Sequence, residues 1–168
     1  HSSNSLTVGT FHAYRGRSGL HWFGSRILPR ALEPFAGKIA VSTSAREFIS
    51  RYYPGDYKII PNGIDIEHFS GAVEPIPELC DGKLNILFVG RLEKRKGLSH
   101  LLSAYSVLKM QHTNIRLIVV GPGNLDKEIY GILGARALED VVFTGAVSYE
   151  DLPRYFSAAH IFCSPATG

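Results

Sequence analysis

The chain has 168 residues, of which 45% are hydrophobic and 20% are charged, and this balance argues against disorder and for a globular protein. No apolar run approaches the ~20 residues that a membrane-spanning helix needs, and the N-terminus lacks a signal-peptide pattern, which argues against an integral membrane protein. Cys80 and Cys163 have no partners at metal-ligand spacing, which indicates a reducing, cytoplasmic compartment and a buried thiol at Cys163.

The net charge of +3 conceals an uneven distribution of basic residues. Four arginines precede the first acidic residue, Glu33, and aromatic and histidine side chains accompany them. These arginines are Arg15, Arg17, Arg26 and Arg30. Such a segment suits an anionic substrate, an anionic membrane surface or a nucleic acid, but no nucleic-acid-binding motif supports the third partner. The alternative is that the arginines coat a helix that packs against another domain.

In chain order, the first 61 residues predict three short strands and two helices. The strands are expected over residues 6–11, 38–42 and 57–60, and the helices over residues 20–32 and from Ser42 or Ser44 to Tyr52. Either serine is a good N-cap, and Pro54-Gly55 ends the second helix. Residues 62–83 are rich in turn-forming residues and predict an interdomain linker.

From residue 84 onward, strands and helices alternate. The strands are expected over residues 84–89, 115–120, 141–143 and 161–163, and the helices over residues 98–110, 125–138 and 149–157. These strands are continuous apolar runs, as expected when helices cover both faces of a parallel sheet. The sequence therefore predicts an α/β fold with a Rossmann-like parallel sheet and flanking helices.

Glycine-containing loops follow three of these strands, at residues 90–97, 121–124 and 144–145. The carboxyl ends of parallel strands meet at one edge of a sheet, where α/β proteins bind their ligands. The first loop brings backbone N–H groups, the positive end of a helix dipole and up to four cationic side chains to one point. It therefore suits a phosphate or pyrophosphate. The alternative is a solvated basic surface turn.

No motif predicts a metal ion or a redox cofactor. The acidic residues that follow residue 125 are spaced like those of an ordinary helix surface. They are Asp126, Glu128, Glu139 and Asp140. Gly121-Pro122-Gly123 differs from the G-x-G-x-x-G fingerprint, and no acidic ribose-binding residue follows it, which argues against a dehydrogenase. The chain begins almost in a strand and ends in a strand-end loop, so we expect a piece of a longer protein.

Six short segments, taken in order, resemble those of a known family. They are Gly9-Thr10-Phe11-His12, Ile39-Ala40-Val41-Ser42, Pro61-Asn62-Gly63-Ile64-Asp65, Gly90-Arg91-Leu92 with Lys96-Gly97, Val120-Gly121-Pro122-Gly123 and Phe143-Thr144-Gly145. The set is similar to the group-one (family four) retaining glycosyltransferases of GT-B fold, among them bacterial phosphatidylinositol mannosyltransferases. The resemblance implies that residues 1–61 end an N-terminal acceptor domain. Residues 84–168 would then begin a C-terminal nucleotide-sugar domain.

The resemblance also implies roles for individual residues. Arg91 and Lys96 would hold the diphosphate of the donor and stabilise the departing phosphate without a metal ion. His12 would be the active-site histidine that contacts a sugar hydroxyl or the acceptor, and the alternative is a histidine that only packs at a strand end. The residues expected to border the nucleotide and its base are Gly90, Gly121, Gly123, Phe143, Thr144 and Gly145.

The substrates implied by the resemblance are GDP-mannose, rather than a UDP-sugar, and a lipid or glycan acceptor. The basic segment would then face an anionic headgroup at the inner face of the plasma membrane. A pair of glutamates with seven residues between them and an early glycine-rich loop, both typical of the family, are absent, so we expect no turnover by this chain alone. The alternatives are a non-catalytic nucleotide-binding module and a sugar-nucleotide epimerase of GT-B fold.

Overall fold

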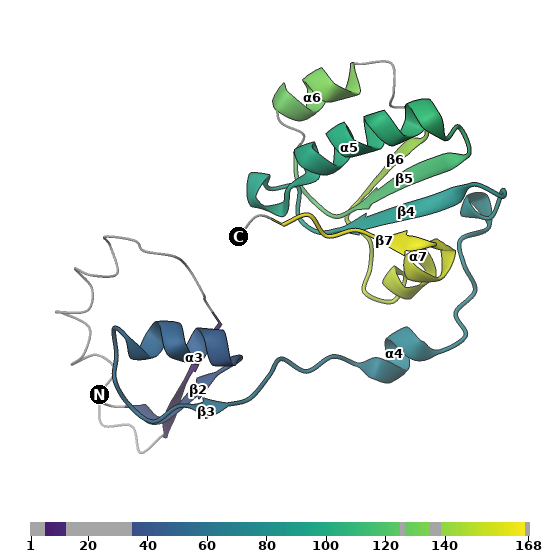
Figure 1. The fold of residues 1–168 in the computed structure, drawn as a ribbon. Helices are drawn as coiled ribbons and strands as arrows, with labels where there is room; N and C mark the ends of the chain where they lie inside the picture. Colours follow the sequence, from purple (N-terminus) through teal and green to yellow (C-terminus); the bar gives the residue numbers. More distant parts are fainter. Residues whose placement is uncertain (1–5, 13–34, 125–126, 135–138, 167–168) are drawn as a thin grey trace. The chain divides into compact units, whose positions relative to one another are not determined.

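The structure, a computed structural model, describes residues 6–12, 35–124, 127–134 and 139–166. The chain divides into two compact units, His1–Ile64 and Asp65–Gly168 (Figure 1). The helix predicted over residues 20–32 and the arginines of the basic segment lie outside the described residues.

Unit 1 contains a parallel sheet in the order β1-β2-β3, formed by β1 (Thr7–Phe11), β2 (Phe35–Ala40) and β3 (Lys58–Ile59). Helix α3 (Thr43–Ser50) begins where predicted, because Ser42 Oγ accepts a hydrogen bond from Ala45 N at 3.1 Å. Among the described residues of this unit, Ala40, Ala45 and Tyr57 form a buried hydrophobic cluster.

Unit 2 contains a parallel four-stranded sheet in the order β6-β5-β4-β7. Its elements after residue 83 are β4 (Leu84–Val89), α5 (Leu98–Gln111), β5 (Ile115–Val120), α6 (Lys127–Leu133), β6 (Val141–Gly145), α7 (Leu152–Ala158) and β7 (Ile161–Phe162). The predicted parallel sheet with flanking helices is confirmed, and β4 and β5 have the predicted bounds. Strand β5 is buried along its whole length, as expected for a central parallel strand.

The two faces of this sheet have separate cores, because successive residues of a strand point to opposite faces. Phe88 of β4 and Val119 of β5 belong to the core that contains Leu102 of α5 and Ile129 of α6. On the opposite face, Leu87 and its neighbours on β5 pack with Ala158 of α7. Figure 1 shows α5 and α7 on opposite sides of the sheet.

Several predicted element bounds are wrong by a few residues. Helix α7 begins at Leu152 rather than at Tyr149, which places Pro153 in the first turn, where the missing N–H of proline has no helical partner to lose. Helix α6 ends at Leu133 rather than at residue 138, and Gly134 N donates to Tyr130 O at 3.0 Å in the turn that follows. Cys163, predicted to be buried, is only partly buried.

The stretch predicted as a linker, residues 62–83, contains two short helical elements, and its residues from Asp65 onward belong to unit 2. The elements are α4 (Ile66–Ser70) and a 3₁₀ helix, η1 (Pro77–Leu79). Leu79 is buried in the core that contains Leu87, and the His68 ring stacks on Tyr149 with 4.3 Å between ring centroids. The proline-rich composition concealed these contacts, because each depends on residues far along the chain.

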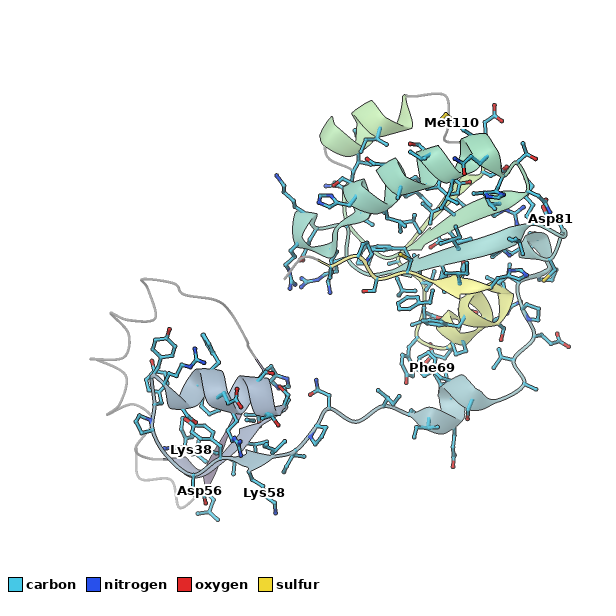
Figure 2. The ribbon with its side chains drawn as sticks, viewed as in Figure 1. Lys38, Asp56, Lys58, Phe69, Asp81 and Met110 are labelled. Carbon is cyan, nitrogen blue, oxygen red and sulfur yellow. The ribbon has the colours of Figure 1, made fainter. Side chains whose placement is uncertain are left out.

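Partly buried ion pairs join segments at the edge of the unit 2 sheet where the strands begin. The nearly buried Arg116 of β5 forms an ion pair with Asp81, which is labelled in Figure 2. Asp140 pairs with Lys83 and with Lys109, whose Nζ lies 2.7 Å from Asp140 Oδ2. The prediction that Asp140 is an ordinary helix-surface acid is therefore wrong, since Asp140 precedes β6 in a left-handed conformation with φ 67°.

Candidate active site

The predicted loops meet at the edge of the unit 2 sheet where the strands end. Gly90 N donates to Val120 O at 2.9 Å, and Leu92 N donates to Pro122 O at 2.9 Å, so the loops that follow β4 and β5 are joined. Gly121 N donates to Gly145 O at 2.8 Å, which joins the loop after β5 to the end of β6. We call this set, residues 90–97, 121–124 and 144–145, the strand-end loops.

At two glycines in these loops, the backbone approaches another backbone segment more closely than a residue with a Cβ atom would permit. Gly121 has φ 143°, and a Cβ at this position would lie 2.0 Å from the Gly90 carbonyl oxygen. Gly97 has φ 72°, and its Cβ would lie 2.2 Å from the Pro165 carbonyl oxygen. Gly97 therefore brings the basic turn into contact with the loop that follows β7.

The basic turn leads directly into a long helix. Residues 94–96 form a 3₁₀ helix, η2 (Lys94–Lys96), and Gly97 is the N-cap residue of α5. Glycine has no side chain with which to cap the helix, so the N–H groups of the first turn stay available to a ligand. The positive end of the α5 dipole adds to the charge of the turn, and the combination suits an anion.

Glu93 lies between two of the turn's arginines and pairs with both. Its Oε1 is 2.9 Å from Arg91 Nη1, and its Oε2 is 2.7 Å from Arg95 Nε. The hydrogen bond from Arg95 lowers the pKa of Glu93, and the charges of Arg91, Arg95 and Lys96 lower it further. The turn therefore carries a fixed carboxylate among its four cations.

Lys96 differs from the two arginines because no carboxylate of the described residues forms a salt bridge with it. The side chain is half-buried beside the end of β4, where a Cβ built at Gly90 would lie 3.9 Å from Lys96 Cδ. Lys96 thus presents, next to the strand-end loops, an ammonium group that forms no salt bridge with a described carboxylate.

The remaining predicted residues of unit 2 also lie at these loops. Gly123 packs against Leu92, since a Cβ at Gly123 would come within 2.7 Å of Leu92 Cβ. The Phe143 side chain packs against the core under α5, and Thr144 Oγ1 donates to Gly145 O at 3.0 Å. Any contact of Phe143 with a ligand at the loops would therefore come from its backbone.

His12 belongs to unit 1, where it directly follows β1 and is exposed. Its predicted role in the active site, like the roles of Arg91 and Lys96, stays a prediction. Arg15, Arg17, Arg26 and Arg30 lie outside the described residues, so their predicted contact with an acceptor or membrane also stays a prediction.

Two features of the site were missed in the sequence. The alternation of charge in Arg91-x-Glu93-x-Arg95 was a signal that Glu93 could pair with both arginines. The contact between Gly97 and Pro165 had no local signal, because it joins segments from different parts of the chain.

Metal and membrane features were also sought in the described part of the chain. Within it, no group of three histidine, cysteine or carboxylate side chains could hold a metal ion. Likewise, no helix among these residues is both long and apolar enough to cross a membrane.

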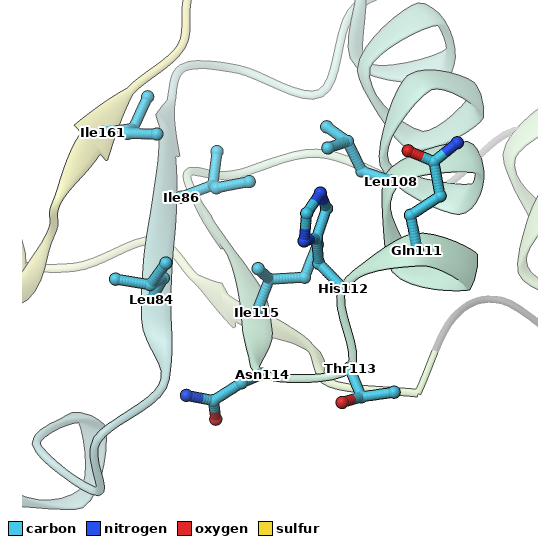
Figure 3. Close-up of a pocket in the computed structure, with 9 residues that line it drawn as sticks. All are labelled: Leu84, Ile86, Leu108, Gln111, His112, Thr113, Asn114, Ile115 and Ile161. Carbon is cyan, nitrogen blue, oxygen red and sulfur yellow. The ribbon is translucent and has the colours of Figure 1, made fainter.

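An apolar pocket of about 500 Å³ opens at the opposite edge of the sheet, where β4 and β5 begin and α5 ends (Figure 3). Its apolar lining consists of Leu84, Ile86, Leu108, Ile115 and Ile161. None of the predicted site residues lines this pocket, so the candidate site remains the strand-end loops.

Comparison with solved structures supports the fold assignment. Over 98% of this chain and 47% of the other, the apo structure of OtsA matches with a TM-score of 0.74 at 15% sequence identity. The structure of Anabaena HepE in complex with UDP-glucose matches with a TM-score of 0.69 at 19% identity, over 95% of this chain and 47% of the other. At such low identity these likenesses show the fold alone, and they confirm the α/β fold of GT-B glycosyltransferases.

Comparison of sequences shows the family. The phosphatidyl-myo-inositol mannosyltransferase of Mycobacterium tuberculosis is 32% identical over 162 residues, and the match covers 96% of this chain. The chain spans about 42% of the length of that relative. Residues 73–167 match the family described as glycosyl transferases group 1. Because this match covers more than half of the chain, the chain belongs to the group 1 glycosyl transferases, a family of sugar-transferring enzymes.

Proposed function

We propose that the strand-end loops of unit 2 bind the diphosphate of a nucleotide-sugar donor. The observation that carries this proposal is the convergence, at one edge of the sheet, of the half-buried Lys96, the first turn of α5 and the glycine-lined loop at Gly121. Each of these features stabilises an anion.

The reaction proposed for the protein that contains this chain is transfer of a sugar with retention of the anomeric configuration. Breaking the bond between the sugar and the phosphate builds negative charge on the leaving oxygen. Arg91 and Lys96 would stabilise this charge as fixed cations, so that a divalent ion is not required.

Mannose from GDP-mannose is the donor that we propose. The relative from M. tuberculosis carries mannosyl transfer in its name, and the similarity extends along 96% of the present chain. The same name mentions phosphatidyl-myo-inositol, which supports a lipid or glycan acceptor for this protein too. His12 and the arginines of the basic segment would contact that acceptor, at the inner face of the plasma membrane, and unit 1 would belong to the acceptor domain.

Titration calorimetry of the 168-residue chain with GDP, UDP and ADP, in the presence of EDTA, tests the donor site. We expect GDP to bind more tightly than the other two. Lys96→Ala should weaken GDP binding about 10- to 100-fold, the usual effect of losing a charge-assisted hydrogen bond. Lys94→Ala is the matched control, because it removes the same charge from an exposed position of the same turn and should change affinity only about twofold.

The possible outcomes separate the parts of the proposal. A preference for UDP would overturn GDP-mannose as the donor while leaving the site in place. Equal effects of Lys96→Ala and Lys94→Ala would contradict the specific role of Lys96. Binding that requires added magnesium would contradict the metal-independent site, and no binding by a folded chain would overturn the site as a whole.

A further inference from the structure

Glu93 stands out because it is an acidic residue in the middle of a turn that is otherwise cationic. Its two carboxylate oxygens hold different arginines, at 2.9 Å from Arg91 and 2.7 Å from Arg95. An arginine that already pairs with a carboxylate has lost part of its capacity to pair with a phosphate, since both anions accept hydrogen bonds from the N–H edges of the guanidinium group.

We propose that Glu93 is an internal counter-ion of Arg91, which a phosphate group of the donor must displace before Arg91 can bind it. This inference rests on the proposed function, because it concerns the same anion site. It assigns Glu93 a role in selecting the ligand, separate from the roles of Arg91 and Lys96.

The backbone of the turn keeps Glu93 close to the site even when its side chain moves. Glu93 N donates to Arg91 O at 2.8 Å, and Lys96 N donates to Glu93 O at 2.8 Å. The Arg91 side chain is 62% exposed, so its guanidinium group is free to turn from the carboxylate to a ligand. The displaced carboxylate then stays near the bound anion and repels it.

The contrast between Arg91 and Lys96 shows which anionic ligands Glu93 affects most. Lys96 has no carboxylate partner among the described residues, so a single phosphate can pair with it at once. A second phosphate gains Arg91 only by exchange with Glu93. Glu93 therefore weakens the binding of ligands with two linked phosphates, which must compete for Arg91, more than it weakens the binding of inorganic phosphate.

The test compares Glu93→Gln with the unaltered chain. Glutamine has the size of glutamate without its charge, so Arg91 is released with little change of shape. Exposed ion pairs are weak, and the expected increase in affinity is correspondingly moderate, about three- to tenfold for inorganic pyrophosphate and for GDP at low ionic strength. The gain for inorganic phosphate should be smaller, because a single phosphate can pair with Lys96 without displacing Glu93, so the preference for pyrophosphate over phosphate should increase.

Two controls separate release of Arg91 from a general change of charge. Glu139→Gln removes the same charge from an exposed residue that precedes β6, at the other edge of the sheet, and should leave affinity nearly unchanged. In an Arg91→Gln background, Glu93→Gln should lose most of its effect, because Glu93 is proposed to act through Arg91.

Several results would overturn this role of Glu93 while leaving the anion site intact. They are unchanged or weaker pyrophosphate binding by Glu93→Gln, an equal gain in Glu139→Gln, and an undiminished gain without Arg91. If neither the unaltered chain nor Glu93→Gln binds pyrophosphate or GDP, the proposed function fails and the role of Glu93 fails with it.

Discussion

At the scale of single residues, the packing of the strand-end loops requires a residue without a Cβ atom at one position. A Cβ at Gly121 would overlap the Gly90 carbonyl oxygen, whereas a Cβ at Gly90 would make ordinary contacts with the Phe88 ring, at 3.5 Å, and with Lys96 Cδ, at 3.9 Å. These two glycines face each other across the same junction, yet only Gly121 is required by its surroundings. The difference between them makes a matched pair for experiment.

We expect Gly121→Ala to lower the free energy of unfolding of unit 2 by about 2–4 kcal/mol. The cause is backbone strain at φ 143° combined with displacement of the loop after β4. Gly90→Ala should change stability by less than about 1 kcal/mol, because 3.5 Å is an ordinary van der Waals contact. Urea unfolding followed by circular dichroism measures both. Equal stabilities of the two variants would mean that the close approach at Gly121 is not rigid.

The location of the site was predicted from the sequence more successfully than the ion pairs and contacts between its residues. Arg91, Lys96 and the glycines could be found because a basic turn after an apolar strand has a local pattern. The neutralising role of Glu93 depends on which rotamers the arginines adopt, and the contact of Gly97 with Pro165 depends on the return of β7 to the side of β4. Local pattern does not contain this information.

At the scale of elements, one polar residue joins three segments of unit 2. Asn85 lies on β4 and is 1% exposed. Its Nδ2 donates to Leu79 O at 2.7 Å and to Ala158 O at 2.8 Å, which ties η1 and the end of α7 to the sheet. Asn85 N also donates to His160 Nδ1 at 3.0 Å, just before β7.

Replacing this residue should destabilise the unit although the new side chain is apolar. Asn85→Leu leaves the carbonyl groups of Leu79 and Ala158 buried without their donor, and we expect a loss of about 2–4 kcal/mol in the free energy of unfolding. Asn114→Ala removes a comparable but exposed hydrogen bond to Gly82 O and should cost less than about 1 kcal/mol. Chemical denaturation of both variants makes the comparison, and an unchanged Asn85→Leu protein would refute the joining role.

Elements made from strong apolar runs could be predicted from the sequence, and those stabilised by tertiary contacts could not. The bounds of β4 and β5 are as predicted because each strand is a mostly apolar run, and β5 is buried along its whole length. Helix α4 and the 3₁₀ helix η1 were taken for a linker, since Leu79 and His68 gain their partners only from distant residues, Leu87 and Tyr149. Burial of Leu79 anchors η1, whereas α4 has no buried residue and begins at Asp65, whose side chain accepts a hydrogen bond from His68 N at 3.0 Å.

At the scale of the whole unit 2 sheet, the two edges differ in how their charges are balanced. At the edge where the strands begin, Arg116 pairs with Asp81, and Lys83 and Lys109 pair with Asp140. At the other edge, Lys96 has no carboxylate partner among the described residues. The first edge is built for stability and the second retains a charge for a ligand, which is the arrangement expected when binding is confined to one edge.

The paired edge should make unit 2 sensitive to acid. Hydrogen bonds from Lys109 and Lys83 lower the pKa of Asp140, and a hydrogen bond from Arg116 lowers the pKa of Asp81. A carboxylate whose pKa is lowered by folding stabilises the folded state above its unfolded pKa. This stabilisation decreases as the pH falls below the unfolded value and is lost once the pH passes through the folded pKa. The free energy of unfolding should therefore fall from about pH 5 downward.

Asp140→Asn tests this origin of the acid sensitivity. Asparagine tolerates the left-handed conformation at φ 67° as well as aspartate does, so the variant removes the charge without adding backbone strain. At pH 7 we expect the variant to be less stable by about 1–2 kcal/mol, because Lys83 and Lys109 lose their common partner. The difference should shrink toward zero as the pH falls through the lowered pKa of Asp140, where the carboxylate itself becomes protonated and neutral. Urea unfolding of both proteins across this pH range measures the difference, and a deficit that persists undiminished in acid would mean that the shape of the Asp140 turn, rather than its charge, holds this edge of the sheet together.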